Sequence, residues 1–153
     1  MRERVHYLAA VHSRIEVKIQ AQTALEKARG KRFLVLAGSA KDVNAQFLHR
    51  GQMKILAPLL ERGEVELAAE AWTPDWDPEQ AYQITRRTIQ EKGPLDAVIA
   101  SNDGTAGGAV RAIKELLPDR KVLVTGMDTE LAACRRLIEG TQTMTVYMPI
   151  KLQ

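Results

Sequence analysis

The sequence is poor in the residues on which many functional sites depend. It has one cysteine, Cys134, among its 153 residues, so it can form no intrachain disulfide and no zinc site built on paired cysteines. Its three histidines, His6, His12 and His49, lie in the first third of the chain, and no spacing predicts three convergent metal ligands. No Ser-His-Asp, Cys-His or paired-carboxylate pattern is present. These absences argue against an enzyme and against a bound metal or other cofactor.

Aromatic side chains and long apolar runs are also scarce. Aromatic residues make up 5% of the chain, which removes the stacking surface that single-strand nucleic-acid-binding proteins use. The net charge is only +3, and the basic residues are interspersed with acidic ones, so no nucleic-acid face is expected. No run approaches the roughly 18 apolar residues of a membrane span. The N-terminus lacks the features of a signal peptide, so the sequence as written predicts a cytoplasmic protein.

What the sequence does contain is a regular alternation of short apolar runs with amphipathic segments. The patterns predict helices at 44–62, 78–92, 105–117 and 130–139, and strands at 33–37, 65–72, 95–100, 121–125 and 142–147. A length of 153 residues suits a single compact domain. Strands that alternate with helices imply right-handed crossovers and a parallel sheet. We therefore expect an α/β three-layer sandwich with a five-stranded parallel sheet, of flavodoxin-like or half-Rossmann type.

The first thirty residues are less clear. Ser13 and Glu16 fit a capping box, so a helix is expected from residue 14 to residue 29, before Gly30. The segment 1–12 has two interpretations. A strand over residues 7–11 is one, and a backward extension of the helix is the other, because apolar residues there also fall on one helical stripe.

The segment 97–110, AVIASNDGTAGGAV, leads from an expected strand into a glycine-rich turn. Its glycines, Gly104, Gly107 and Gly108, match neither the dinucleotide-binding fingerprint nor the P-loop, which needs a lysine after its last glycine. Phosphate binding is therefore not expected. We interpret Gly107 and Gly108 as positions that let the helix approach the sheet closely.

Polar and aromatic residues gather where the expected strands end. Trp72 and Trp76 follow one strand, Asn102 and Asp103 another, and Asp128 a third. Ligands of open parallel sheets bind at this carboxyl edge. An indole face packs on the C–H groups of a sugar, an asparagine offers a donor and an acceptor, and an ionised aspartate accepts from paired hydroxyls. The set predicts a sugar site, although Asp103 also suits the cap of the next helix and Trp72 also suits the sheet core.

Several segments closely resemble the periplasmic D-xylose-binding proteins of ABC sugar importers. They are QFLHRGQMKI at 46–55, AWTPDWDP at 71–78, ASNDGTAGGA at 100–109, GMD at 126–128 and GTQTMTVY at 140–147. The resemblance begins at about residue 13. It implies a two-lobed periplasmic protein that closes on its sugar, of which this chain is the C-terminal lobe. It also implies that Trp76 stacks on the xylose ring and that Asn102 and Asp128 hydrogen-bond its hydroxyls.

In the same comparison, residues 1–12 correspond to the hinge segment, residues 13–147 to the α/β core and residues 148–153 to a shortened hinge crossing. Two positions depart from the family. A lysine that reaches the sugar is replaced by Met148, and a hinge Asp-Asn pair is replaced by His12 and Ser13. Each lost charged contact is worth about 1.5–3 kcal/mol. We therefore expect the lone lobe to bind a monosaccharide weakly or not at all.

Two alternative functions follow from these departures and from the fold. The first is an isolated, truncated or redesigned lobe that serves as a stand-alone scaffold with no physiological ligand. Apolar residues at 148–150 would then favour a homodimer through the surface that the missing lobe leaves. The second is an effector-binding domain of a repressor, which shares this fold; the chain has no DNA-binding segment to support it.

Overall fold

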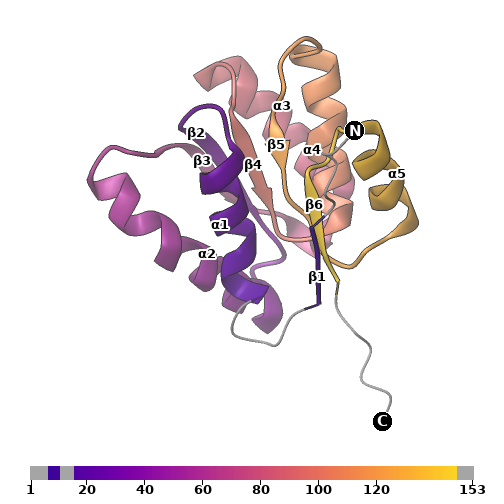
Figure 1. Ribbon diagram of the computed structural model, residues 1–153, viewed down its shortest axis with the longest axis horizontal. Coiled ribbons are helices and arrows are strands. Elements are labelled where there is room, and N and C mark those ends of the chain that lie inside the picture. The colour runs from indigo at the N-terminus through magenta and orange to yellow at the C-terminus, as the bar shows by residue number, and fades with distance from the viewer. Residues whose placement is uncertain (1–6, 11–15, 148–153) are drawn as a thin grey trace.

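The computed structural model describes residues 7–10 and 16–147, and its centre is a parallel β-sheet (Figure 1). The strands lie in the order β3-β2-β4-β5. Their bounds are β2 (Arg32–Ala37), β3 (Glu66–Trp72), β4 (Ala97–Ala100) and β5 (Leu123–Val124). Every pairing between them is parallel, so the carboxyl ends of the strands meet at one edge of the sheet.

Helices cover both faces of this sheet. On one face lie α1 (Glu16–Lys27) and α2 (Val43–Glu61), and on the other α3 (Pro78–Lys92) and α4 (Asp103–Leu116) (Figure 1). The alternation of side chains along a strand explains this arrangement. Phe33 and Val35 pack in the core beneath α1 and α2, and Leu34 and Leu36 pack beneath α3 and α4. The predicted three-layer α/β sandwich is confirmed.

The predicted count of five strands in one sheet is wrong. The main sheet has four strands, and the fifth expected strand, β6 (Met144–Tyr147), pairs in parallel with β1 (Tyr7–Ala10). Among the described residues, an isolated bridge between Met127 and Val146 and a hydrogen bond from the amide of Thr143 to the carbonyl of Val124, at 2.9 Å, connect this pair to β5 and the segment that follows it. The reason is that β5 has only two residues. It is too short to form a regular ladder of hydrogen bonds with β6. The fifth helix, α5 (Leu131–Glu139), packs beside α4 and β6.

Of the two interpretations of residues 1–12, the structure has a strand at Tyr7–Ala10, so the helical one is wrong for these residues. Pairing with β6 satisfies backbone groups that an edge would otherwise leave unpaired. The rest of that segment, the capping box at Ser13 and the departures at His12 and Met148 lie outside the described residues. The homodimer expected through residues 148–150 also concerns undescribed residues and stays a prediction.

The expected role of the glycines in α4 needs a correction. A Cβ added at Gly108 would lie 2.1 Å from the carbonyl oxygen of Pro78 and 2.9 Å from the amide nitrogen of Tyr82. Gly108 therefore permits the close approach of α4 to α3, and not to the sheet. A Cβ at Gly107 would instead meet the guanidinium group of Arg136, at 3.0 Å.

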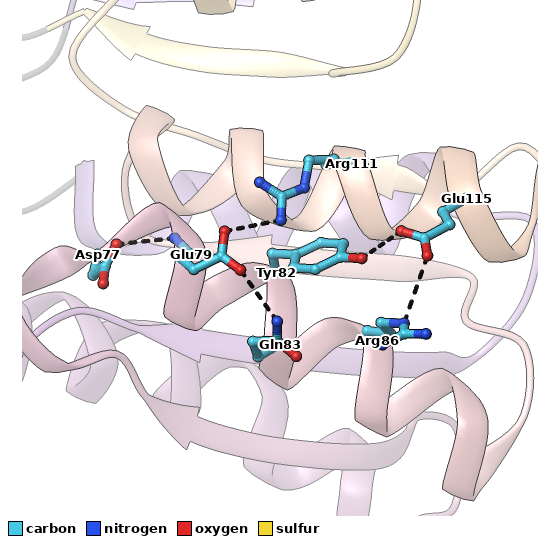
Figure 2. Close-up of polar contacts among 7 residues, drawn as sticks. All are labelled: Asp77, Glu79, Tyr82, Gln83, Arg86, Arg111 and Glu115. Atoms are coloured by element: carbon cyan, nitrogen blue, oxygen red, sulfur yellow. Dashed lines mark hydrogen bonds and ion pairs between the residues drawn. The ribbon is translucent and has the colours of Figure 1, made fainter.

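Polar side chains strengthen the contact between α3 and α4 on its outer side. The guanidinium carbon of Arg111 lies 3.6 Å from the centre of the Tyr82 ring, a favourable cation–π arrangement. Arg111 also forms an ion pair with Glu79 at 2.8 Å. The Tyr82 hydroxyl donates to the carboxylate of Glu115 (Figure 2). These contacts join the N-terminal half of α3 to the C-terminal half of α4.

Candidate functional site

The segments that follow β2, β4 and β5 lie side by side at the carboxyl edge of the sheet. The amide of Ser101 donates to the carbonyl of Leu36 at 3.2 Å, and the amide of Asp103 donates to the carbonyl of Met127 at 2.9 Å. Asn102 directly precedes Asp103, and Asp128 directly follows Met127, so both residues lie next to this second bond. We call the edge formed by Gly38, Trp76, Asn102 and Asp128 the rim.

Trp76 is held in place from two sides. It ends the short 3-10 helix η1 (Pro74–Trp76) with a left-handed backbone, φ 56°. Its ring lies on Gly38, where an added Cβ would be 2.3 Å from Cη2. Its Nε1 donates to Oδ2 of Asp42 at 3.0 Å, and Oδ1 of Asp42 caps α2 by accepting from the amide of Asn44. The half-buried indole therefore has a defined orientation at the end of β2.

Two other aromatic residues near the strand ends, Trp72 and Tyr147, are placed differently from Trp76. The ring centre of Trp72 lies 4.7 Å from that of His49 in α2, and His49 in turn contacts the carboxylate of Glu70. Trp72 therefore belongs to the contact between α2 and β3. Tyr147, at the end of β6, is 44% exposed.

Asn102, and not Asp103, caps α4. Its Oδ1 accepts from the amide of Thr105 at 2.9 Å and from the Thr105 hydroxyl at 2.7 Å. Because an amide N–H can only donate, this contact identifies the oxygen of the Asn102 side chain. No described residue forms a hydrogen bond with Nδ2 of Asn102. Asn102 was expected to offer a ligand both a donor and an acceptor. Because Thr105 uses its Oδ1, the side chain offers a ligand only the Nδ2 donor.

Asp103 is fully buried and cannot reach a ligand at the rim. Its carboxylate accepts three hydrogen bonds, from the amide of Glu130 (2.9 Å), from Nε2 of Gln142 (2.9 Å) and from the hydroxyl of Thr145 (3.0 Å). The expected capping role is wrong, because these distant donors draw the Asp103 side chain into the interior.

Asp128 is exposed, and within the described residues its carboxylate accepts no hydrogen bond. Its backbone is left-handed, with φ 101°, which is uncommon for a residue other than glycine. Partial loss of hydration, and then the nearby Asp103 carboxylate, raise the pKa of Asp128 above its ordinary value. An ionised Asp128 is therefore a carboxylate with unused acceptor capacity at the rim.

This raised pKa predicts a pH-dependent effect on stability. A carboxyl group with a higher pKa in the folded than in the unfolded chain makes folding less favourable once it ionises. Asp128→Asn is therefore expected to raise the free energy of unfolding at pH 7. The gain should shrink as the pH falls through the raised pKa of the folded protein towards 3.8, the ordinary pKa of the group, and should be absent below that pH. Urea unfolding of both proteins at neutral and acidic pH tests this, and a gain independent of pH would contradict it.

Beneath the rim, two glutamines that the sequence patterns did not single out tie the helices to the strand ends. Nε2 of Gln20, in α1, donates to the carbonyls of Ser101 (3.2 Å) and Gly126 (3.0 Å). Nε2 of Gln52, in α2, donates to Oε1 of Gln20 at 2.6 Å. Both glutamines are fully buried. Their spacing on amphipathic helices gave no signal that distinguished them from surface residues.

The fold and the rim together define a class of protein. The chain is an α/β lobe that presents one fixed indole, one amide donor and one carboxylate at the carboxyl edge of a parallel sheet, where such folds bind ligands. The model of the periplasmic binding protein domain matches residues 18–153. The chain therefore belongs to the periplasmic binding protein family.

Curated relatives and solved structures agree with this assignment. The chain is 39% identical over 134 residues to the D-xylose-binding periplasmic protein of Haemophilus influenzae, covering 87% of this chain and 40% of that protein. It is 38% identical over 136 residues to the protein of the same name from Escherichia coli, covering 88% and 41%. A solute-binding protein of an ABC transporter from Clostridium phytofermentans, solved with β-D-glucose, has a TM-score of 0.79 at 27% identity, covering 88% and 46%.

The chain thus spans about 40% of the length of the curated xylose-binding relatives that it matches. The resemblance stated from the motifs is confirmed, and so is the expectation that the chain is not an enzyme, since its relatives are periplasmic sugar-binding proteins. Among the described residues, no helix combines the length and apolar character that crossing a membrane requires.

Proposed function

We propose that this chain is the carbohydrate-binding lobe of a solute-binding protein of an ABC importer, with a pentose such as D-xylose as its ligand. Trp76, Asn102 and Asp128 would contact the sugar. One observation carries the proposal: the Nδ2 donor of Asn102 and the carboxylate of Asp128 are both unused by described residues, and the Trp76 indole has a fixed orientation at the same edge of the sheet. The names of the curated relatives support the ligand, and they also support the periplasm as its compartment.

The chemistry of the rim suits a polyhydroxylated ring. A sugar hydroxyl both donates and accepts, so neighbouring hydroxyls can donate to the Asp128 carboxylate and accept from Nδ2 of Asn102. The C–H groups of the ring then pack on the Trp76 indole, whose Nε1 is already bonded to Asp42. A pentose offers both kinds of surface within one small ligand.

Binding by this lobe alone is expected to be weak. Hydrogen bonds to charged groups contribute about 1.5–3 kcal/mol and neutral ones about 1 kcal/mol, and association itself opposes them. We therefore expect a Kd of about 10 mM or weaker. The chain spans about 40% of its curated relatives, so contacts from the rest of such a protein would have to supply tighter binding.

A titration with D-xylose followed by tryptophan fluorescence tests this function. Asn102→Ser keeps a hydroxyl that can cap α4 and removes the Nδ2 donor, so we expect binding about tenfold weaker with little change in melting temperature. Asn44→Ser is the matched control, because the Asp42 contact of Asn44 uses its backbone amide, which serine retains.

The outcomes separate the competing functions. Saturable binding that is weakened in Asn102→Ser and unchanged in Asn44→Ser supports the sugar-binding lobe. A flat titration of folded protein into the hundreds of millimolar would contradict the ligand and favour the stand-alone scaffold. A micromolar affinity would contradict the view that the rim is only part of a site.

A further inference from the structure

The loop between β5 and α5 carries an unusual backbone. Asp128 has φ 101° and Thr129 has φ 52°, and neither residue is a glycine. Left-handed backbone is unfavourable for such residues and persists only where the surrounding structure determines it. The contacts that hold this loop therefore decide where the Asp128 carboxylate points.

Three consecutive backbone amides of the loop are each fixed by a different acceptor. The amide of Asp128 donates to the carbonyl of Val146 (2.9 Å), that of Thr129 to Oγ1 of Thr145 (3.2 Å) and that of Glu130 to Oδ2 of Asp103 (2.9 Å). Two of the three acceptors are side chains, so substitution can remove them one at a time.

The two side-chain acceptors are themselves connected. The hydroxyl of Thr145 accepts from the amide of Thr129 and donates to Oδ2 of Asp103 at 3.0 Å. A threonine hydroxyl has one hydrogen and can use it only once, so the two bonds define one orientation of the hydroxyl. Thr145 thus links the loop to the buried carboxylate.

Asp103 is held from behind by two further residues. Nε2 of Gln142 donates to its Oδ1 at 2.9 Å, and the guanidinium group of Arg136 donates to its carbonyl oxygen, also at 2.9 Å. Asp103 and Thr145 are both 0% exposed, so neither can touch a ligand at the rim. Any effect that they have on binding is therefore indirect, and the hydrogen bonds above connect both residues to the loop.

We propose that Thr145 and Asp103 are positioning residues, which hold the loop at 127–130 in the conformation that presents Asp128 to the sugar. The assignment of Asp128 to the sugar rests on the proposed function. The hold on the loop itself rests only on the hydrogen bonds described above.

Two variants of Thr145 test this proposal. Thr145→Val keeps the branched shape and removes the hydroxyl, which leaves the Thr129 amide without its acceptor. Thr145→Ser keeps the hydroxyl and is the matched control. Amide hydrogen exchange of Thr129, followed by NMR, should be at least about tenfold faster in Thr145→Val than in the wild type. It should be nearly unchanged in Thr145→Ser.

The amide of Thr125 serves as an internal reference, because it donates within the sheet to the carbonyl of Val98. Exchange that accelerates at Thr129 while Thr125 keeps its rate supports a local hold on the loop. Equal acceleration at both amides would show a loss of global stability only and would overturn the proposal. An unchanged rate at Thr129 would overturn it as well.

The affinity for D-xylose gives the second readout. Thr145→Val should weaken binding at least about fivefold, as Asp128→Asn should, and Thr145→Ser should not. If Asp128→Asn loses affinity and Thr145→Val does not, the positioning role is overturned and the proposed function remains. If the wild type itself binds no xylose, the proposed function fails, and the exchange of Thr129 alone decides whether these residues hold the loop.

Discussion

Replacement of Gly108 by alanine is expected to lower the free energy of unfolding by roughly 2 kcal/mol or more. The new Cβ would lie 2.1 Å from the carbonyl oxygen of Pro78 and 2.9 Å from the amide nitrogen of Tyr82. Both are backbone atoms of α3, so relief requires the two helices to separate. Alanine favours a helix interior over glycine by about 1 kcal/mol, which offsets only part of this overpacking. Urea unfolding followed by circular dichroism measures the difference.

Gly104→Ala provides the control in the same helix. The nearest atom to an added Cβ there is Cγ of Pro78 at 3.6 Å, an ordinary van der Waals contact. The helix preference of alanine should therefore leave stability unchanged or raise it by up to about 1 kcal/mol. If Gly108→Ala proves as stable as Gly104→Ala, the contact of α3 and α4 at Gly108 is looser than the structure shows.

Gly38→Ala is expected to weaken xylose binding by about tenfold or more, a change of about 1.4 kcal/mol. Its Cβ would lie 2.3 Å from Cη2 of Trp76, so the indole would have to leave its position over Gly38. Because Trp76 is only half-buried, we expect a smaller loss of stability than in Gly108→Ala. Fluorescence titration measures the affinity, and urea unfolding measures the stability.

A second variant separates displacement of the indole from other effects of the new methyl group. Asp42→Asn keeps an oxygen that can cap α2 and loses the second acceptor, which receives Nε1 of Trp76. It should weaken xylose binding less than Gly38→Ala does. If Gly38→Ala binds xylose as tightly as the wild type does, Trp76 is not part of the sugar site.

Local patterns were enough to predict most of the fold. The apolar run in β2 indicated a strand buried on both faces, and its alternate residues do pack in two different cores. Asp77, a favourable capping residue directly before the predicted helix at 78–92, does cap α3 by accepting from the amide of Glu79 at 2.9 Å. Helix α5 ends at Gly140, which is left-handed with φ 83°. Each of these signals lies within a few residues of the feature that it predicts.

The features that local patterns missed depend on distant partners. Tyr7–Ala10 is a strand because β6, at the other end of the chain, pairs with it, and the same residues fit a helical stripe when considered alone. The main sheet has four strands where five were expected, because a two-residue β5 cannot carry a regular ladder across to β6.

The same limit applies to the rim. Asn102 and Asp103 are adjacent, and both residue types are good helix caps, so preference alone cannot choose between them. The choice depends on Gln142 and Thr145, which donate to Asp103 and leave the cap to Asn102. The left-handed backbone of Asp128 had no local signal either, since no glycine marks it.

The most direct test of the central claim, that this rim binds a sugar, is an NMR titration of the wild-type chain with D-xylose. The chain has two tryptophans, so two indole N–H signals are expected, and Trp76→Phe identifies the one at the rim. We expect the Trp76 signal to shift saturably while the Trp72 signal shifts much less, because Trp72 packs against His49. Unmoved signals, or equal shifts with glycerol at the same concentration, would contradict the claim.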